Sequence, residues 1–138
     1  MKISKEKFFV ITSNNQPGEL ARVNATLMEE RVDCSGIWGF PVHGKSAEIT
    51  VLPRNPTKFI DTAKRAQWET REGVCFHLEG ADATGALVDI LRKLADDGIN
   101  LQAVDAMAVE GKFGCCLWVS DAETEHVSQV LGLSTPKP

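Results

Sequence analysis

The sequence predicts an α+β protein made of two copies of one small unit, each an antiparallel sheet with two helices on one face. Two observations predict this fold class. A shift of 67 positions brings Phe9 onto Phe76, Gly18 onto Gly85 and Leu27 onto Leu94. Strand-type and helix-type patterns also follow one another in the same order in both halves. Self-similarity at a fixed spacing indicates a repeated structural unit.

The repeat extends over nearly the whole chain without a gap, from about residue 8 to residue 131. It brings the Val42-x-Gly44-Lys45 pattern onto Val109-x-Gly111-Lys112, and Val51 onto Trp118. We therefore predict two domains, 1–72 and 73–138, joined at Glu72-Gly73. Units of about seventy residues are near the size at which a lone core is marginal, so we expect them to pack on each other or on a second chain.

The first copy is expected to begin with a strand and a helix. Residues 8–12 are β-branched and aromatic, as in a strand. Residues 14–18 have turn chemistry, and Pro17 suits the first turn of a helix. Leu20, Val23 and Leu27 then recur at helical spacing and predict the apolar face of that helix.

The rest of the first copy completes a six-element order. Residues 34–42 and 47–51 read as two strands of a hairpin, joined by a turn at residues 43–45, with one buried face. Asn55-Pro56 predicts the cap and first turn of a second helix. Residues 67–72 give a closing strand. The order strand, helix, strand, strand, helix, strand is the ferredoxin-like arrangement.

The second copy repeats this order with clearer helix signals. Its first helix has an apolar stripe at Leu87, Ile90, Leu91 and Leu94, and Gly98 stands where a C-cap glycine belongs. Residues 120–123 form a capping-box pattern ahead of its second helix. The tail, residues 134–138, contains two prolines and makes a poor strand. We therefore expect the last strand of the second unit to be weak or missing.

Composition indicates a soluble globular protein without a polyanion-binding surface. The net charge is −4, and 43% of residues are hydrophobic against 25% charged. This balance argues against a general binder of nucleic acid or anionic lipid. Residues 1–7 are charged and lack the apolar stretch of a signal peptide, and no segment approaches a membrane span. We expect a cytoplasmic location.

The cysteines and histidines do not form a recognisable site. Cys34, Cys75, Cys115 and Cys116 contain no CxxC pair and are interpreted as reduced, small core residues. No histidine stands at ligand spacing from them. A nucleophile elbow, a phosphate-binding glycine loop and an HExxH motif are all absent. We therefore predict no enzyme, no catalytic residue, no metal and no cofactor, with a Cys–His pair left open because sequence distance does not limit spatial distance.

The segment Asn15-Gln16-Pro17-Gly18-Glu19-Leu20, placed after an apolar strand, resembles the opening motif of ACT domains. ACT domains also have a Gly-Ile-Asn-like segment that connects the first helix to the next strand. This segment matches Gly98-Ile99-Asn100-Leu101 well and Arg31-Val32-Asp33-Cys34 loosely. The resemblance covers almost the whole chain as a tandem pair. In this respect the chain resembles small stand-alone tandem ACT proteins that bind amino acids. The resemblance implies a homodimer that is regulated by a free amino acid.

The resemblance also implies where the ligand binds. In ACT proteins the ligand lies between this loop and the second strand of a neighbouring unit, which here is residues 34–38. Gly18 would let the backbone approach the ligand, and the Asn15 amide could contact both charged ends of an amino acid. The candidate ligand-binding residues are Asn15, Gln16, Pro17, Gly18, Glu19, Leu20, Ser35, Gly36, Ile37, Trp38, Asp82, Thr84, Gly85, Leu87, Leu101 and Gln102.

Several interpretations stay open. The second loop, residues 81–85, lacks the proline, and Asp82 suits an ammonium rather than a carboxylate, so the first loop is favoured. Pro17-Gly18 could be a plain helix-opening turn, Asn15 or Asp82 an N-cap, and Trp38 a packing residue. The alternative function is a regulatory subunit that acts in trans on an amino-acid biosynthetic enzyme, such as an acetolactate-synthase-like enzyme. A small enzyme is the third alternative.

Overall fold

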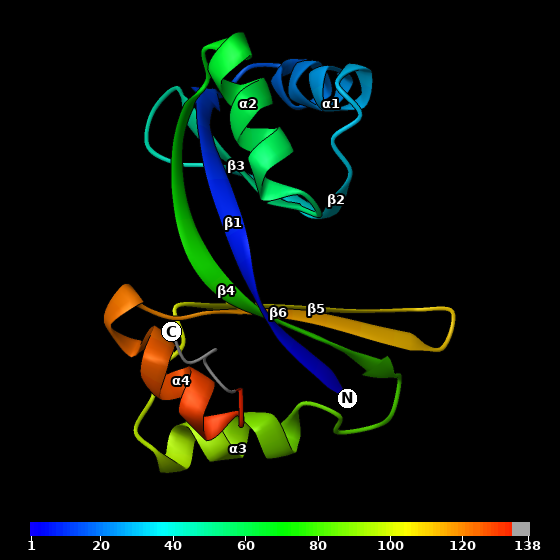
Figure 1. Cartoon of the computed structure of the whole chain (residues 1–138), viewed down its shortest axis with the longest axis vertical. Coiled ribbons are helices and arrows are strands. Elements are labelled where there is room, and N and C mark those ends of the chain that lie inside the picture. The colour runs from blue at the N-terminus through cyan, green and yellow to red at the C-terminus, as the bar shows by residue number, and fades with distance from the viewer. Residues whose placement is uncertain (134–138) are drawn as a thin grey trace. The chain divides into compact units, whose positions relative to one another are not determined.

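The computed structural model describes residues 1–133 of the chain and confirms the α+β class. Figure 1 shows its helices and strands. The elements of the first half are β1 (Lys2–Asn14), α1 (Glu19–Glu29), β2 (Cys34–Pro41), β3 (Ser46–Pro53) and α2 (Pro56–Ala66). Those of the second half are β4 (Glu69–Ala81), α3 (Val88–Asp96), β5 (Ala103–Val109), β6 (Lys112–Trp118), the 3₁₀ turn η1 (Asp121–Glu123) and α4 (Thr124–Val130). Hydrogen-bonded neighbours follow the order β2-β3-β1-β4-β6-β5.

The chain divides into two compact units. One comprises Lys7–Gly73, and the other comprises Met1–Glu6 together with the residues from Val74 onward. The join after Gly73 lies one residue from the predicted boundary. The division departs from domains 1–72 and 73–138 at the N-terminus, because the first six residues group with the second unit. β4 passes through the join, so the predicted closing strand at residues 67–72 is the first part of a longer strand.

The first unit has its helices on one face of its sheet, as predicted. α1 and α2 lie on the same side of β1 and β3 (Figure 1). Alternate residues of both strands point at these helices, since Phe9, Ile11, Ile49 and Val51 are all buried in one core. The helices fill the core with Val23 and Leu27 from α1 and with Phe59 and Ala63 from α2.

The second unit has an equivalent core with one unexpected contributor. Its buried residues are Phe76, Leu78, Leu94, Ile99, Cys115, Leu117, Val119 and Val127. Ile3, from the charged N-terminal segment, packs against this core. The Lys2 ammonium lies 3.6 Å from the Glu79 carboxylate on β4. Residues 1–7 contain only two apolar side chains, Met1 and Ile3, among polar and charged ones, which is too short a pattern to predict a strand.

The N-terminal segment takes the place of a last strand in the second unit. In the first unit, the strand order β2-β3-β1-β4 ends with the closing strand β4. Read from the other edge, the order β5-β6-β4-β1 ends with β1, whose first residues belong to the second unit. The segment that we expected to be a poor strand, residues 134–138, lies outside the described residues.

The gapless repeat is wrong by one residue in the hairpins. Phe9 is paired with Val51 in the first unit, whereas its counterpart Phe76 is paired with Leu117. Val51 therefore corresponds to Leu117 and not to Trp118. The turns explain the slip: Pro41 and Ala47 pair with five residues between them, whereas the counterpart of Pro41, Ala108, pairs with Phe113 across four, and the innermost pair there, Val109 with Lys112, encloses Glu110 and Gly111 alone. Both of these residues have positive φ, 51° and 76°, as a tight type I′ hairpin requires.

His126 links the end of α3 to the start of α4. Its Nε2 lies 3.1 Å from an oxygen of Asp97, and its Nδ1 lies 3.3 Å from an oxygen of Glu123. The contact with Asp97 first, and then that with Glu123, raises the pKa of His126 above its ordinary value. The imidazolium is therefore favoured in the folded protein.

We expect His126→Gln to reduce stability in acid more than in alkali. Because the folded-state pKa is raised, the stabilisation is fully present below the unfolded-state pKa of about 6.5 and is lost as pH rises through the folded-state value. Urea midpoints of the wild type and the variant, measured from about pH 5 to pH 9, should converge at the alkaline end. A difference between the two proteins that is the same at every pH would show that these contacts contribute no charge-dependent stability.

Candidate functional site

The predicted ligand loop connects β1 to α1. The backbone N–H of Asn15 donates to the carbonyl of Lys45 in the β2–β3 turn, and the N–H of Glu19 donates to the carbonyl of Gln16 over 3.3 Å. These bonds hold the loop against the hairpin of its own unit. Gly18 has φ +89°, a left-handed conformation that a residue with a side chain rarely adopts.

The start of α1 is open. Gly18 is its N-cap, and no side chain caps the helix. Asn15 therefore does not have the capping role that was its plainer interpretation, and its side chain makes no hydrogen bond to any residue in the described range. A Cβ placed on Gly18 would meet no atom within 4 Å. Exposed N–H groups at a helix start attract anions through hydrogen bonds and the helix dipole.

Glu19 places a fixed negative charge beside this helix start. Its carboxylate accepts hydrogen bonds from the Arg22 guanidinium, at 2.7 Å, and from the Ser13 hydroxyl. These bonds, that of Arg22 being the larger influence, lower the pKa of Glu19, so the group is ionised at neutral pH. The loop thus presents backbone donors suited to a carboxylate and, a residue away, oxygen acceptors suited to an ammonium.

A small hollow of about 160 Å³ lies between this loop and the hairpin of the same unit. It is lined by Asn14, Asn15, Gln16, Glu19, Leu20, Gly39, Phe40, Pro41, Ala47, Glu48 and Ile49. Typical ligand pockets begin at about 300 Å³, so this one suits a molecule of few atoms. Four of the predicted loop residues line it, namely Asn15, Gln16, Glu19 and Leu20.

Leu20 is not buried in the core with the other two residues of its predicted apolar helix face. Its side chain is 46% exposed, whereas Val23 and Leu27 are buried. A Cβ placed on Gly39 would lie 3.7 Å from Leu20, so Leu20 extends over this bare position of β2. Helical spacing predicts that Leu20 lies on the same helix face as Val23. At the first turn of α1, however, this face borders the hollow, and Leu20 lines it.

The predicted strand residues lie elsewhere on β2. Ser35–Trp38 do not line the hollow, which takes residues 39–41 from the same strand. Trp38 covers Gly36, because a Cβ on Gly36 would lie 2.3 Å from the Trp38 ring. Ile37 borders a separate depression of about 520 Å³ beside Asn24 and Met28. Gly39, Phe40, Pro41 and Glu48 were missed; the hairpin register, which sets them next to the loop, would have located them.

In the second unit the predicted site residues separate into two groups. Leu87 and Leu101 pack against the core. Asp82, Thr84 and Gln102 are exposed, and Gly85 has φ +74°. The N-cap of α3 is Leu87, so Asp82 does not cap that helix, and its side chain makes no hydrogen bond within residues 1–133. The backbone N–H of Asp82 donates to the Gly111 carbonyl, as that of Asn15 does to Lys45.

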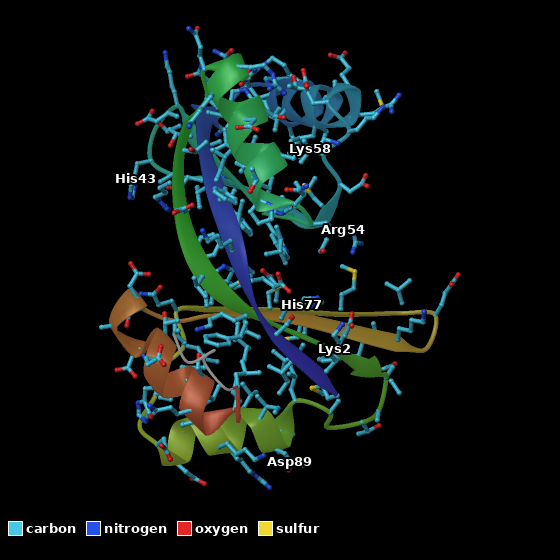
Figure 2. All side chains as sticks on the ribbon, viewed as in Figure 1. Lys2, His43, Arg54, Lys58, His77 and Asp89 are labelled. Atoms are coloured by element: carbon cyan, nitrogen blue, oxygen red, sulfur yellow. The ribbon has the colours of Figure 1, made fainter. Side chains whose placement is uncertain are left out.

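The cysteines are free thiols, and three of the four are buried. Burial raises the pKa of Cys115 to about 11, and a hydrogen bond from Cys75 to Cys116 raises that of Cys75. Cys115 faces the core, and Cys116 contacts Cys75 on the opposite face, as adjacent strand residues must. His43 lies in the β2–β3 turn and His77 on β4 (Figure 2). Within residues 1–133 no three His, Cys, Asp or Glu side chains are placed to hold a metal ion.

Comparison with known proteins places this fold. A Bacteroides thetaiotaomicron protein has a TM-score of 0.82 at 17% identity, over 94% of this chain and 88% of that one. The regulatory subunit of aspartate kinase from Thermus thermophilus, in its ligand-free form, has a TM-score of 0.65 at 11% identity, over 98% and 96%. The Thermus flavus subunit has 0.57 at 13%, over 95% and 94%. The chain has the fold of an aspartate kinase regulatory subunit.

At these identities, the likeness to the aspartate kinase regulatory subunits establishes the fold alone, and the assignment as a tandem, stand-alone ACT protein stays a prediction. No protein-family model and no curated protein matches the chain. None of the helices in the described part of the chain is long and apolar enough to cross a membrane.

Proposed function

We propose that this chain is a non-catalytic regulatory protein that binds a free amino acid at the Asn15–Leu20 loop. The observation that carries the proposal is the open start of α1: an uncapped helix with nothing above Gly18 and an unengaged Asn15 amide beside it. The likeness to aspartate kinase regulatory subunits supports a regulatory protein.

The chemistry of the loop matches the two charged ends of an amino acid. The ligand carboxylate would accept from the backbone N–H groups of Leu20 and Ala21, in the first turn of α1, where the helix dipole favours negative charge. The ammonium would face the Asn15 amide oxygen and the ionised Glu19. A small apolar side chain would enter the hollow between Leu20 and Phe40.

A second unit would complete the site. The hollow within the first unit is small, and its rim residue Phe40 is 54% exposed. We propose that a strand of a neighbouring unit covers the ligand, as the ACT resemblance implies. Ligand that contacts two units at once favours the arrangement in which both contacts form, and this population shift would be the regulatory signal.

A thermal-shift screen against the twenty amino acids tests the proposal. A ligand that binds only the folded state stabilises it by about 2.7 kcal/mol at 100 times its dissociation constant. We expect one amino acid, or a related group, to raise the melting temperature. Gly18→Val should abolish this rise, because the side chain occupies the open space above the loop.

Gly98→Val, in the second unit, is the matched control for Gly18→Val. Gly98 also has positive φ, +72°, and open space around its missing Cβ, so both variants place a β-branched side chain in the left-handed region, at a cost of about 1–2 kcal/mol. Only Gly18 belongs to the proposed site. Retention of the full ligand-induced rise in Gly18→Val would refute the site, and the absence of a rise with every amino acid would refute the ligand class.

A second function is supported by the comparisons: a regulatory subunit that acts in trans on an amino-acid biosynthetic enzyme. The Thermus proteins that share this fold over nearly their whole length are regulatory subunits of aspartate kinase. Copurification from native extract distinguishes the two functions. A stoichiometric biosynthetic enzyme would support action in trans, and a chain that purifies with itself alone would support an independent sensor.

A further inference from the structure

Gly114 on β6 is a glycine that no side chain covers. Five glycines lie in the strands of residues 1–133, and a Cβ placed on each shows what lies above it. On Gly36 it would lie 2.3 Å from the Trp38 ring, and on Gly73 it would lie 2.6 Å from the Phe8 ring. Two further strand glycines also lie beside another residue, Gly39 beside Leu20 and Gly80 beside Met1. A Cβ on Gly114 would meet no atom within 4 Å, so the described part of the chain leaves this position open.

The fold does not require glycine at this position. Gly114 does not have the positive φ of the turn glycines. It stands three residues before Leu117, and its counterpart in the first unit, three residues before Val51, is Glu48. The Glu48 carboxylate accepts a hydrogen bond of 3.0 Å from the Arg71 guanidinium. Glycine weakens the interior of a strand, and it often marks a place where another molecule approaches the backbone closely. The second unit thus leaves open a position that the first unit fills with an ion pair.

Gly114 lines a depression of about 1010 Å³ in the second unit. The next residue, Cys115, faces the core, so Gly114 lies on the sheet face turned away from that core. Glu79 on β4 and Met107 on β5 pair with Gly114 from either side and therefore share this face. The depression thus has Gly114 as its floor and one wall on each neighbouring strand.

The two walls differ in chemistry. The β5 wall is apolar, since Met107 is 70% exposed and Val109 is 59% exposed. The β4 wall is polar, because the Glu79 carboxylate lies 3.6 Å from the Lys2 ammonium and His77 lines the same depression (Figure 2). Glu79 accepts hydrogen bonds, and Lys2 donates them. A molecule that suits both walls has a flat apolar face, with a donor and an acceptor along one edge.

We propose that this depression binds a nucleobase, whose ring lies on Gly114 with its hydrogen-bonding edge toward Glu79 and Lys2. Adenine, for example, presents an amino donor beside the acceptor N7. A tryptophan side chain of a protein has a donor alone and would leave Lys2 without a partner. The Met107 thioether can contact the ring edge favourably. The charged lining residues, two positive and two negative, do not favour a strongly charged ligand: they are Lys2, Lys112, Glu79 and Glu110.

NMR of the methionine methyl groups in the full chain tests this site. Of the three methionines, Met107 and Met1 line the depression, whereas Met28 lies on α1 in the first unit. With isotope-labelled methyl groups, we expect at least one of adenosine, guanosine, cytidine and uridine to displace the Met107 signal through its ring current. The Met28 signal should stay in place, although that side chain is 73% exposed. Ribose, which has no aromatic ring, should displace neither signal.

Three variants separate binding at Gly114 from a general effect. Gly114→Leu fills the floor and should abolish the displacement, and it should fold because no atom lies within 4 Å of the new Cβ. Ala106→Leu adds the same side chain on the opposite face of β5, since Ala106 pairs with Cys115, and it should respond as the wild type does. Glu79→Gln leaves the floor open and should weaken binding about fivefold, because hydrogen bonds to a charged group are stronger than neutral ones.

The same spectra contain the results that would overturn the proposal. One is a Met107 signal that no nucleoside displaces. Another is a folded Gly114→Leu variant, or a Glu79→Gln variant, that responds as fully as the wild type. A third concerns the class of ligand: N-acetyltryptophanamide should displace the Met107 signal less than the best nucleoside, and a larger displacement would exclude a nucleobase site.

Discussion

Phe59→Ala is expected to lower the free energy of unfolding by about 3–5 kcal/mol, the cost of removing a fully buried aromatic side chain. Phe59 is 0% exposed and lies at the centre of the first core. Its ring centroid is 4.6 Å from that of Phe9 on β1 and 6.2 Å from that of Trp68. The side chain therefore packs α2 against the sheet. Alanine would leave a cavity between the Phe9 and Trp68 rings, which cannot move far enough to fill it.

Urea denaturation followed by circular dichroism measures this loss. Phe59→Leu keeps most of the volume and should lose clearly less than alanine. Met28→Ala, at a side chain that is 73% exposed, should remain within about 0.5 kcal/mol of the wild type. A loss below about 1 kcal/mol for Phe59→Ala would mean that the first core does not depend on this ring.

Gly36→Ala should cost about 1–3 kcal/mol through overpacking, although alanine is otherwise the better residue in a strand. The new Cβ would lie 2.3 Å from one carbon of the Trp38 ring and 2.8 Å from another. The indole cannot keep its position over the strand, and its displacement exposes the apolar surface that it covers.

A double-mutant cycle isolates this contact. Trp38→Leu removes the ring, so Gly36→Ala made in that background should cost much less than in the wild type. Denaturation midpoints of the four proteins give the coupling free energy directly. Additive losses would show that Gly36 is needed for a reason other than the Trp38 ring.

Much of the fold could be predicted because two independent patterns agree. The repeat and the alternation of apolar residues along the strands both indicate the same buried strand faces. Phe9, Ile11, Phe76 and Leu78 are core residues in both descriptions. The first part of β1 could not be found in this way, since a segment with only Met1 and Ile3 among polar and charged residues is too short to give a periodic signal. The hairpin slip also escaped detection, because identical Gly-Lys pairs aligned two turns of different length.

The hollow is lined by four residues of the predicted loop and by none of the predicted strand residues 35–38. Pro17-Gly18 marks a turn whatever surrounds it, so the local sequence carries the information. Which part of β2 borders that turn depends on strand register, and Pro41 rather than Ser35 is the residue that lines the hollow. A turn length, which the sequence does not state, decides this pairing. Leu20 illustrates the same limit. Helical spacing predicts the helix face on which Leu20 lies, but it does not predict whether that face meets the core or the hollow at this turn.

The division of β1 between the two units has a consequence for synthesis on the ribosome. Residues 7–73 emerge as one uninterrupted stretch that contains every part of the first unit. Residues 1–6 emerge before it, yet the β-strand and core against which Ile3 packs are translated only afterwards. A nascent chain of which residues 1–73 have left the ribosome would thus carry every part of the first unit, together with an N-terminal half-strand whose partner strand and core residues are not yet available.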